Sequence, residues 1–431
     1  MTTQSSSLLI AGTTLLGTFL KYPRLILYTR WFDYFFVLRH IFLPYGEKEN
    51  RAAEKKISAF LGVKHTVLVP MGRMAMFHGC EALIDDGDEI IMSPLTVPEC
   101  VSLTVLSGSR PVFVDVNKDT WCMDTELIQK SITPKTRAIL ATHLYGFTQD
   151  LENLRAVAKK NKVMLIEDAA QAFGAQTTRG MAGSSERFGV FSFSYPKNIC
   201  TFFGGALVTN DTELANKISS KLKKLNVMPA SWYLRRAVTS CIKDIATSKL
   251  VYNLLIRHII KVAYKFNIKF LRRFVEVDLA SNLFESIPEN YNTQPTNLIG
   301  RIVRSKLNEV LPEIDHRLTI SNIYWDGLKE VAEINIPNIP INSANTFLYY
   351  PISCNDRDAL MRFLILNGQD VAKQHIPNCA SLPSFEEFWA DCPNAQLLAA
   401  TTITLPTYPG YPEIHAQKTV SLIRKYFNYD T

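Results

Sequence analysis

The sequence predicts an α/β fold with a large, mostly parallel sheet of seven strands and a smaller C-terminal α+β domain. Residues 65–210 contain seven short apolar runs of strand character. Helical segments lie between most of these runs, which is the pattern of a parallel sheet covered on both faces. The chain has 431 residues, of which 47% are hydrophobic and 20% are charged. It is therefore long and apolar enough to form two packed domains.

The first predicted helix covers residues 47–61, where Ala53, Ile57 and Phe60 recur at helical spacing and Gly62 stands at the end. Further helices are expected over residues 74–84, 97–108 and 151–160. The seven predicted strands are "HTVLVP", "EIIMSP", "PVFVDV", "RAILATHLYG", "VMLIEDAA", "VFSFSY" and "GGALVTN".

The character of the chain changes after Asn210. A long basic and aliphatic stretch runs to about residue 279, and the polar linker "SIPENYNTQPTN" follows it. We then expect a long helix over residues 298–331, a strand at 346–352, and helices at 357–368 and 413–427. The predicted division is an N-terminal extension (1–46), a large domain (47–296) with a basic insertion at about 217–279, and a small domain (297–431).

The eight cysteines are scattered singly, without the spacing of a disulfide framework or a zinc site. This favours a reducing, cytoplasmic location. The uncharged apolar run at residues 8–20 is shorter than the roughly 20 residues that cross a bilayer. No basic residues precede it, so it is a poor signal peptide.

Two consecutive acids, Glu167 and Asp168, end the apolar run "VMLIEDAA". An acid at the carboxyl end of a parallel strand lies where open α/β sheets bind ligands. The structural alternative is a carboxylate that caps the next turn through the amides of Ala170 or Gln171.

Lys197 follows the strand "VFSF" and lies five positions after Ser192. Together with Asp168, these residues place an amine, a hydroxyl and a carboxylate at one sheet edge, which suits an aldehyde cofactor with a phosphate and a ring nitrogen. Aromatic surroundings would lower the pKa of the lysine and make it a nucleophile that binds the aldehyde. Asp168 would hold the ring nitrogen protonated, and Ser192 would donate to the phosphate. The structural alternative for Lys197 is a surface lysine.

A glycine at a helix start provides a third candidate. Gly72 follows a strand, and a helix is expected to begin near Met74. Backbone amides at such an N-terminus bind phosphate, and Arg73 would add a fixed positive charge.

The order and spacing of these motifs resemble the DegT/DnrJ/EryC1/StrS family of pyridoxal-phosphate sugar aminotransferases. The resemblance implies the aspartate aminotransferase fold (fold type I), usually as a homodimer with sites built from both subunits. It matches Asp168 to the acid at the pyridine nitrogen, Gln171 to its neighbour near the ring hydroxyl, Ser192 to a phosphate ligand and Lys197 to the lysine that binds the cofactor. The matching segments include "LGVKHTVLVPMGRMAM", "MLIEDAAQAFGA", "FGVFSFSYPKNICTFFGGALVTND" and "ITLPTYPGYPE".

The sequence departs from the family pattern at three places. Arg73 stands where the family usually has threonine, next to Gly72 and Met74 in the phosphate loop. Val97 occupies the position at which an aromatic residue commonly stacks on the cofactor ring. The segment that reaches into the partner's site has no clean equivalent, with Asn292 and Asn297 as candidates.

The resemblance implies transfer of an amino group, with glutamate as the expected donor, to a keto or aldehyde sugar, expected to be nucleotide-linked, for polysaccharide, glycolipid or antibiotic assembly. Some family members have histidine in place of the lysine and dehydrate sugars, so Lys197 favours amino transfer. Two alternatives remain open: a related pyridoxal-phosphate enzyme with another reaction, dehydration or acyl joining, near a membrane, and a non-catalytic ligand-binding regulator.

The segment from residue 217 to 273 carries 14 Lys and Arg residues and one acid, Asp244, within a chain of net charge +7. Arg257, Lys261, Lys265 and Lys269 recur every four residues among aliphatic and aromatic side chains. One interpretation is a solvated basic face, which also suits a nucleotide diphosphate. The other is a peripheral contact with an anionic membrane, supported by a similar mixture at residues 22–44. The interleaved aliphatic residues argue against nucleic acid.

Overall fold

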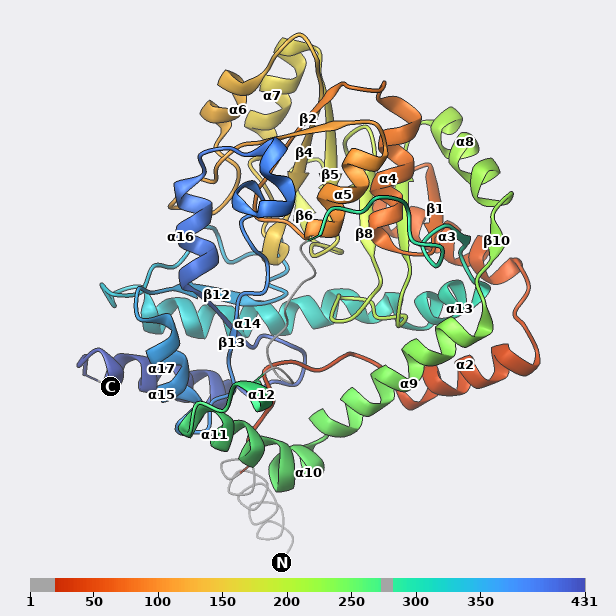
Figure 1. The fold of residues 1–431 in the computed structure, drawn as a ribbon. Coiled ribbons are helices and arrows are strands. Elements are labelled where there is room, and N and C mark those ends of the chain that lie inside the picture. Colours follow the sequence, from red (N-terminus) through yellow and green to blue (C-terminus); the bar gives the residue numbers. More distant parts are fainter. Residues whose placement is uncertain (1–19, 273–281, 431) are drawn as a thin grey trace, which may run out of the picture.

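The computed structural model describes residues 20–272 and 282–430, and its large domain is built on a seven-stranded sheet (Figure 1). Strand β9 runs antiparallel to both of its neighbours, and the other strands are parallel to one another. The predicted seven-stranded, mostly parallel sheet is confirmed. In spatial order its strands are β1 (His65–Val69), β9 (Gly205–Thr209), β8 (Gly189–Ser192), β5 (Met164–Asp168), β4 (Thr136–Thr142), β2 (Glu89–Met92) and β3 (Arg110–Phe113).

Successive side chains of a strand point to opposite faces, and β1 shows how this divides the core. Val67 and Val69 join the cluster that contains residues of α4 and α8, whereas Leu68 joins the cluster of α3 and α13. Helix α3 ends at Gly62, which takes the left-handed conformation with φ 72°. The large-domain helices are α3 (Lys48–Leu61), α4 (Gly72–Leu83), α5 (Pro98–Leu106), α6 (Thr125–Ser131), α7 (Leu151–Asn161) and α8 (Thr212–Leu222).

Two details of this part differ from the prediction. Helix α4 begins at Gly72, two residues earlier than expected, so Gly72 itself belongs to the first turn. Helix α6 was not predicted, although its N-cap is clear: the Asp124 side chain accepts hydrogen bonds from the amides of Glu126 and Leu127.

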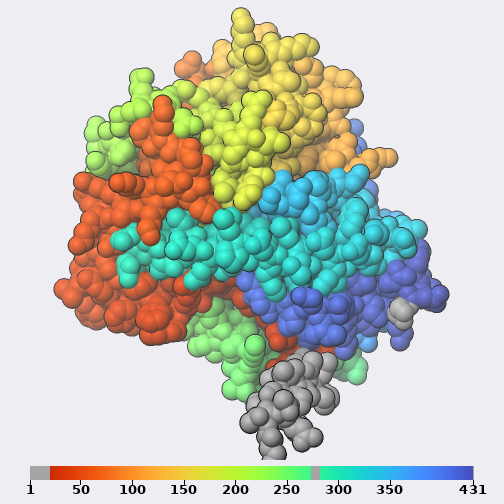
Figure 2. Space-filling view, turned by 180° about the vertical axis from the view of Figure 1, so that it is seen from behind, coloured from red at the N-terminus to blue at the C-terminus, as the bar shows by residue number. Residues whose placement is uncertain are grey.

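The C-terminal part contains a three-stranded antiparallel sheet in the order β12, β14, β13. The long helix predicted over residues 298–331 is two helices, α13 and α14, separated by a 3₁₀ turn at Leu307–Glu309. Figure 2 shows both as one band across the back of the molecule. Helix α13 also packs along α3, so the domain boundary at residue 297 stays a prediction. The elements are α13 (Asn297–Lys306), α14 (Val310–Leu328), β12 (Tyr350–Ser353), α15 (Arg357–Leu366), β13 (Ala372–Lys373), α16 (Pro393–Thr401), β14 (Thr402–Leu405) and α17 (Glu413–Tyr426).

Within the described residues, the basic insertion is largely helical, and residues 31–42 of the N-terminal extension form a helix. They run together along the lower edge of the molecule in Figure 1. The predicted basic stripe of Arg257, Lys261, Lys265 and Lys269 does not lie on one helix. Helix α11 (Arg257–Lys265) carries the first three residues, and Lys269 begins helix α12. Arg273 lies outside the described residues. No helix within residues 20–272 and 282–430 is long and apolar enough to cross a membrane. The helices are α2 (Trp31–Phe42), α9 (Ala230–Thr247), α10 (Lys249–Val251), the π-helical turn η2 (Tyr252–Ile256), α11 (Arg257–Lys265) and α12 (Lys269–Arg272).

Candidate active site

Lys197 and Asp168 meet at the carboxyl edge of the sheet. Strands β5 and β8 are parallel neighbours, so Asp168 at the end of β5 lies beside the loop that carries Lys197 after β8. Both side chains line one cavity. Burial lowers the pKa of Lys197 from 10.5 to about 8; the carboxylate of Asp168 acts in the opposite direction, and the charge of Arg73 adds to the lowering. The lysine is therefore far easier to deprotonate than a surface lysine.

The carboxylate of Asp168 is held by its own loop. Its Oδ1 accepts a hydrogen bond from the Ala170 amide at 3.0 Å, which is the capping contact expected as the structural alternative. No hydrogen bond to Oδ2 is formed within the described parts of the chain. Burial raises the pKa of Asp168, although the Ala170 amide and the charge of Lys197 oppose the rise. One carboxylate oxygen thus serves the fold, and the other remains available to a ligand.

A buried pair behind Asp168 fixes this edge of the site. His143 Nε2 lies 3.0 Å from Glu167 Oε2, which also accepts a hydrogen bond from the Gly183 amide at 2.7 Å. Burial raises the pKa of Glu167, but His143 and the Gly183 amide outweigh it and hold the pKa below its usual value. His143 lines the cavity beside Asp168. The sequence reasoning missed His143, because a single histidine after a strand carries no motif.

The glycines of the predicted phosphate corner allow close packing of α4 on the sheet. A Cβ on Gly72 would lie 2.7 Å from Ser192 Cβ, and a Cβ on Gly205 would lie 2.4 Å from Gly72 Cα. Ser192 Oγ is 3.0 Å from Ser194 Oγ, and both serines line the cavity with Gly72. The N-terminus of α4 and two hydroxyl groups therefore converge at one place, as a phosphate site requires.

Arg73 also lines the cavity, but its charge already has a partner in this chain. Its guanidinium forms an ion pair with Glu99 and donates to the Tyr291 hydroxyl at 3.1 Å. Of the two candidates for a cross-subunit contact, Asn292 is exposed, and Asn297 donates to the Tyr45 carbonyl at 3.0 Å.

Of the remaining predicted cofactor residues, Val97 and Gln171 line the cavity and Met74 does not. Val97 lines the cavity at the start of α5, and Gln171 lines it while its Oε1 accepts from the Tyr145 amide at 3.0 Å. Met74 does not reach the cavity: its side chain is buried in an apolar cluster, and its amide donates to the Met71 carbonyl. Of the three predicted residues Gly72, Arg73 and Met74, the first two reach the cavity.

A larger cavity of about 530 Å³ adjoins this site and shares Gly72, Arg73 and Ser192 with it. Its lining comes largely from the insertion, the N-terminal extension and the small domain, which contribute the cations Arg24, Arg236, Lys243 and Lys373.

His375 also faces the larger cavity; burial and the charge of Lys197 lower its pKa to about 4, so it is neutral at pH 7. Sequence reasoning missed these residues, since they come together only in the fold.

The residues present fit a pyridoxal-type cofactor. Thr142 Oγ1 is buried at the cavity and has no hydrogen-bond partner among the described residues, so it is a polar atom left for a ligand. Asp168 Oδ2 suits a ring N–H, and the serines with the start of α4 suit a phosphate. No group of His, Cys, Asp and Glu side chains that would hold a metal ion occurs in residues 20–272 and 282–430.

Comparisons with known proteins give a consistent result. A model described as the DegT/DnrJ/EryC1/StrS aminotransferase family matches residues 37–233 and 268–424. The chain is 26% identical over 380 residues to UDP-N-acetyl-3-dehydro-alpha-D-glucosamine 3-aminotransferase of Acidithiobacillus ferrooxidans, covering 88% of each chain. It is 37% identical over 166 residues to the spore coat polysaccharide biosynthesis protein SpsC of Bacillus subtilis, covering 38% of this chain and 43% of that protein.

Solved structures share the fold. An aminotransferase from Psychrobacter cryohalolentis superposes with a TM-score of 0.73 at 21% identity, covering 94% of this chain and 99% of that chain. A GDP-4-keto-6-deoxy-D-mannose-3-dehydratase of E. coli with bound hydrated PLP gives a TM-score of 0.71 at 18% identity, covering 95% and 99%. The same fold therefore carries more than one reaction.

Proposed function

The chain belongs to the DegT/DnrJ/EryC1/StrS aminotransferase family, and we propose that it passes an amino group from glutamate to the keto or aldehyde carbon of a nucleotide-linked sugar. The main support for this proposal is that Lys197, whose pKa is lowered to about 8, lines the same cavity as Asp168. The resemblance of the motifs and the chemistry expected from the residues point to the same two side chains.

Pyridoxal phosphate is the cofactor that this site suits. When bound, it supplies an electron sink that stabilises the carbanion formed when an amino compound loses a proton. Lys197 would hold the aldehyde carbon, Asp168 the ring nitrogen, and Ser192 with the start of α4 the phosphate. Gln171 and Val97 would lie along the ring.

Lys197 has a second task as the group that moves protons. With a pKa of about 8, roughly a tenth of its amine is neutral at pH 7, whereas an ordinary lysine with a pKa of 10.5 is almost fully charged. Its Nζ is therefore able to accept a proton from the substrate carbon and return it to a neighbouring carbon. The buried Glu167–His143 pair keeps the adjoining edge of the site rigid.

The larger cavity suits a negatively charged acceptor. Arg73, Arg236, Lys243 and Lys373 line it, and cations of this kind bind phosphates. Two relatives are named for UDP- and dTDP-linked amino sugars, which carry a diphosphate. We therefore propose a nucleotide-linked sugar as acceptor, and a homodimer in the cytoplasm as the working form.

Dehydration is the main rival, because a dehydratase shares the fold. The residue at the reactive position favours amino transfer: a primary amine there is able both to bind an aldehyde cofactor and to move a proton, whereas an imidazole provides only proton transfer.

The test is a two-stage assay with purified, cofactor-loaded protein. Glutamate should change the absorbance of the bound cofactor, and a keto sugar nucleotide should restore it while an amino sugar appears in the mass spectrum. Lys197→Ala should lose both changes, and Lys56→Ala, on the exposed side of α3, should keep them. If no amino donor changes the absorbance while a sugar loses water, the protein is a dehydratase.

A further inference from the structure

Several helices outside the main family match expose apolar side chains in stripes. Residues 20–36 and 234–267 lie outside the matched ranges, and they include half of α2, most of α9, and all of α10, η2 and α11. We define the outer apolar surface as the exposed large apolar residues of α2, α9, α10, η2 and α11 together with Phe266, which follows α11: Trp31, Phe32, Phe35, Leu38, Phe42, Leu234, Val238, Ile242, Ile245, Leu250, Leu254, Leu255, Ile259, Val262 and Phe266.

Helix α2 has two apolar faces. Phe36, Val37 and His40 are buried against the protein, while the outer stripe recurs at intervals of four, three and four residues. Trp31 is 70% exposed and Phe42 is 80% exposed. A helix on the surface of a soluble protein normally has a polar outer face, so this stripe calls for a covering partner.

Helix α9 repeats this arrangement. Tyr233, Ala237 and Ser240 face the protein, and Leu234, Val238, Ile242 and Ile245 form an exposed row beside them. Helix α9 packs against α2 on one side and continues into α10 and η2 on the other. The helices that carry the stripes therefore follow one another along the lower edge of the molecule in Figure 1.

The segments that carry this surface contain many more cationic than anionic side chains. Residues 20–45 and 230–272 contain two carboxylates, Asp33 and Asp244, and both are engaged away from it. Asp33 is buried and pairs with Lys306 at 2.6 Å, and Asp244 accepts hydrogen bonds from Thr29 and Tyr34. Cationic side chains of the same segments are exposed, namely Arg39, Arg235, Lys249, Lys265 and Lys269.

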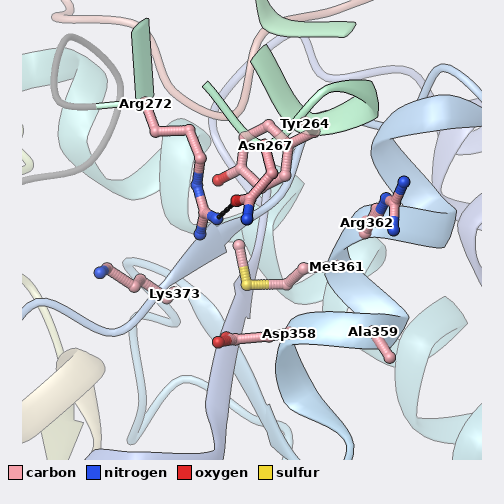
Figure 3. Close-up of a pocket in the computed structure, with 8 residues that line it drawn as sticks. All are labelled: Tyr264, Asn267, Arg272, Asp358, Ala359, Met361, Arg362 and Lys373. Atoms are coloured by element: carbon pink, nitrogen blue, oxygen red, sulfur yellow. Dashed lines mark hydrogen bonds between the residues drawn. The ribbon is translucent and has the colours of Figure 1, made fainter. Parts of the chain in front are cut away.

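Further cations lie at the edge of this surface, in a hollow between α11–α12 and α15 (Figure 3). Arg272, Arg362 and Lys373 line it together with one acid, Asp358. Arg272 donates to Asn267 at 2.9 Å, which holds the guanidinium at the rim. The hollow extends the positive potential beside the apolar stripes.

The N-terminal residues 2–20 of the sequence contain no charged residue, and Lys21, which follows them, lies beside this surface. The Lys21 amide donates to Asn253 Oδ1 at 2.9 Å, and Asn253 Nδ2 donates to the Lys21 carbonyl at 3.0 Å. This pair fixes the point at which the chain arrives, directly beside Leu254 of the outer apolar surface.

We propose that the outer apolar surface binds peripherally to an anionic lipid bilayer. Aromatic and aliphatic side chains enter the boundary between headgroups and acyl chains, and the surrounding cations meet the acidic headgroups. A second copy of the chain fits this surface less well, because a two-fold interface would bring the same unbalanced cations together.

The test is vesicle flotation of the full chain with its cofactor. The protein should float with phosphatidylcholine vesicles that contain phosphatidylserine, weakly with phosphatidylcholine alone, and less as salt is raised. Trp31→Ser with Phe35→Ser, and separately Leu250→Gln with Leu254→Gln, should each weaken binding about tenfold or more. Trp389→Ser with Leu397→Gln, at exposed apolar positions elsewhere, is the matched control and should bind as the unchanged protein does.

Three results would overturn the proposal. The first is no flotation at low salt with phosphatidylserine present. The second is equal flotation of both double variants and the unchanged protein, which would assign lipid binding to another part of the chain. The third is a change from dimer to monomer in the variants, by light scattering, without loss of flotation, which would assign the surface to self-association. Amino transfer to a soluble sugar nucleotide is measured separately, without vesicles. A protein that transfers the amino group but does not float would refute the lipid proposal and leave the proposed activity intact.

Discussion

Replacing Lys197 by methionine should stabilise the cofactor-free protein at neutral pH. The fold keeps this lysine in surroundings that disfavour its charge, since burial lowers its pKa from 10.5 to about 8. Methionine has a similar length and no charge, so the substitution removes an electrostatic cost of folding without opening a large cavity. If removing Lys197 stabilises the fold, the lysine is kept for function and not for stability.

The size and pH dependence of this effect follow from the two pKa values. At about 1.4 kcal/mol for each pH unit, a change from 10.5 to about 8 amounts to about 3 kcal/mol. Between pH 8 and 10.5 the unfolded chain holds a proton on Lys197 that the folded chain has lost. The free energy of unfolding of the wild type therefore rises over this range. The advantage of Lys197→Met should be full below pH 8 and gone above about pH 10.5.

The measurement is urea unfolding of the cofactor-free wild type and the variant at a series of pH values, compared pairwise at each pH. Lys56→Met on α3 is the control, and as an exposed substitution it should change stability by less than about 0.5 kcal/mol at every pH. The reasoning fails if Lys197→Met is no more stable than the wild type at pH 7, or if its advantage does not shrink between pH 8 and 10.5.

Three further predictions concern the surroundings of Lys197. Gly205→Ala would place a Cβ 2.4 Å from Gly72 Cα and should lower the free energy of unfolding, measured with urea, by about 1–3 kcal/mol. An unchanged unfolding midpoint would contradict the close packing. Arg73→Gln should raise the cofactor Kd about tenfold in a fluorescence titration if the guanidinium reaches the phosphate. A change under about twofold would mean that Arg73 only pairs with Glu99 and does not bind the phosphate. Glu167→Gln should lower stability by about 1–3 kcal/mol at pH 7. Because the His143 contact holds the pKa of Glu167 low, this difference should fade as the pH drops below 4.5.

Much of the large domain was predictable because its pattern is local. Apolar runs of strand length alternate with helical segments, and the seven strands form where these runs stand. Asp168 and Lys197 were recognisable for the same reason: each directly follows a strand, and parallel neighbours bring their carboxyl ends together. The resemblance of the motifs then assigned the family, and the family match confirms that assignment.

The remaining features depend on contacts between distant segments. His375 and Lys373 come from the small domain and Lys243 from the insertion, so no spacing in the sequence brings them to one cavity. Met74 was predicted from its place after a glycine, but the earlier start of α4 turns its side chain into the core. The break between α13 and α14 falls just before Pro312, which stands in the first turn of α14 and cannot donate a backbone hydrogen bond to Asn308. The prediction of one helix followed the apolar pattern, which continues across the break, and overlooked this proline.

Helix α9 connects the two proposals of function. Arg236 and Lys243 line the cavity beside the active site, while Leu234, Val238 and Ile242 of the same helix belong to the outer apolar surface. A helix moves as a rigid body, so both of its sides move together. Binding of the outer side of α9 to a bilayer would therefore fix the position of Arg236 and Lys243, which are proposed to bind the acceptor. The insertion thus joins the site of chemistry to the surface proposed to hold lipid, and the acceptor would meet the enzyme at the membrane.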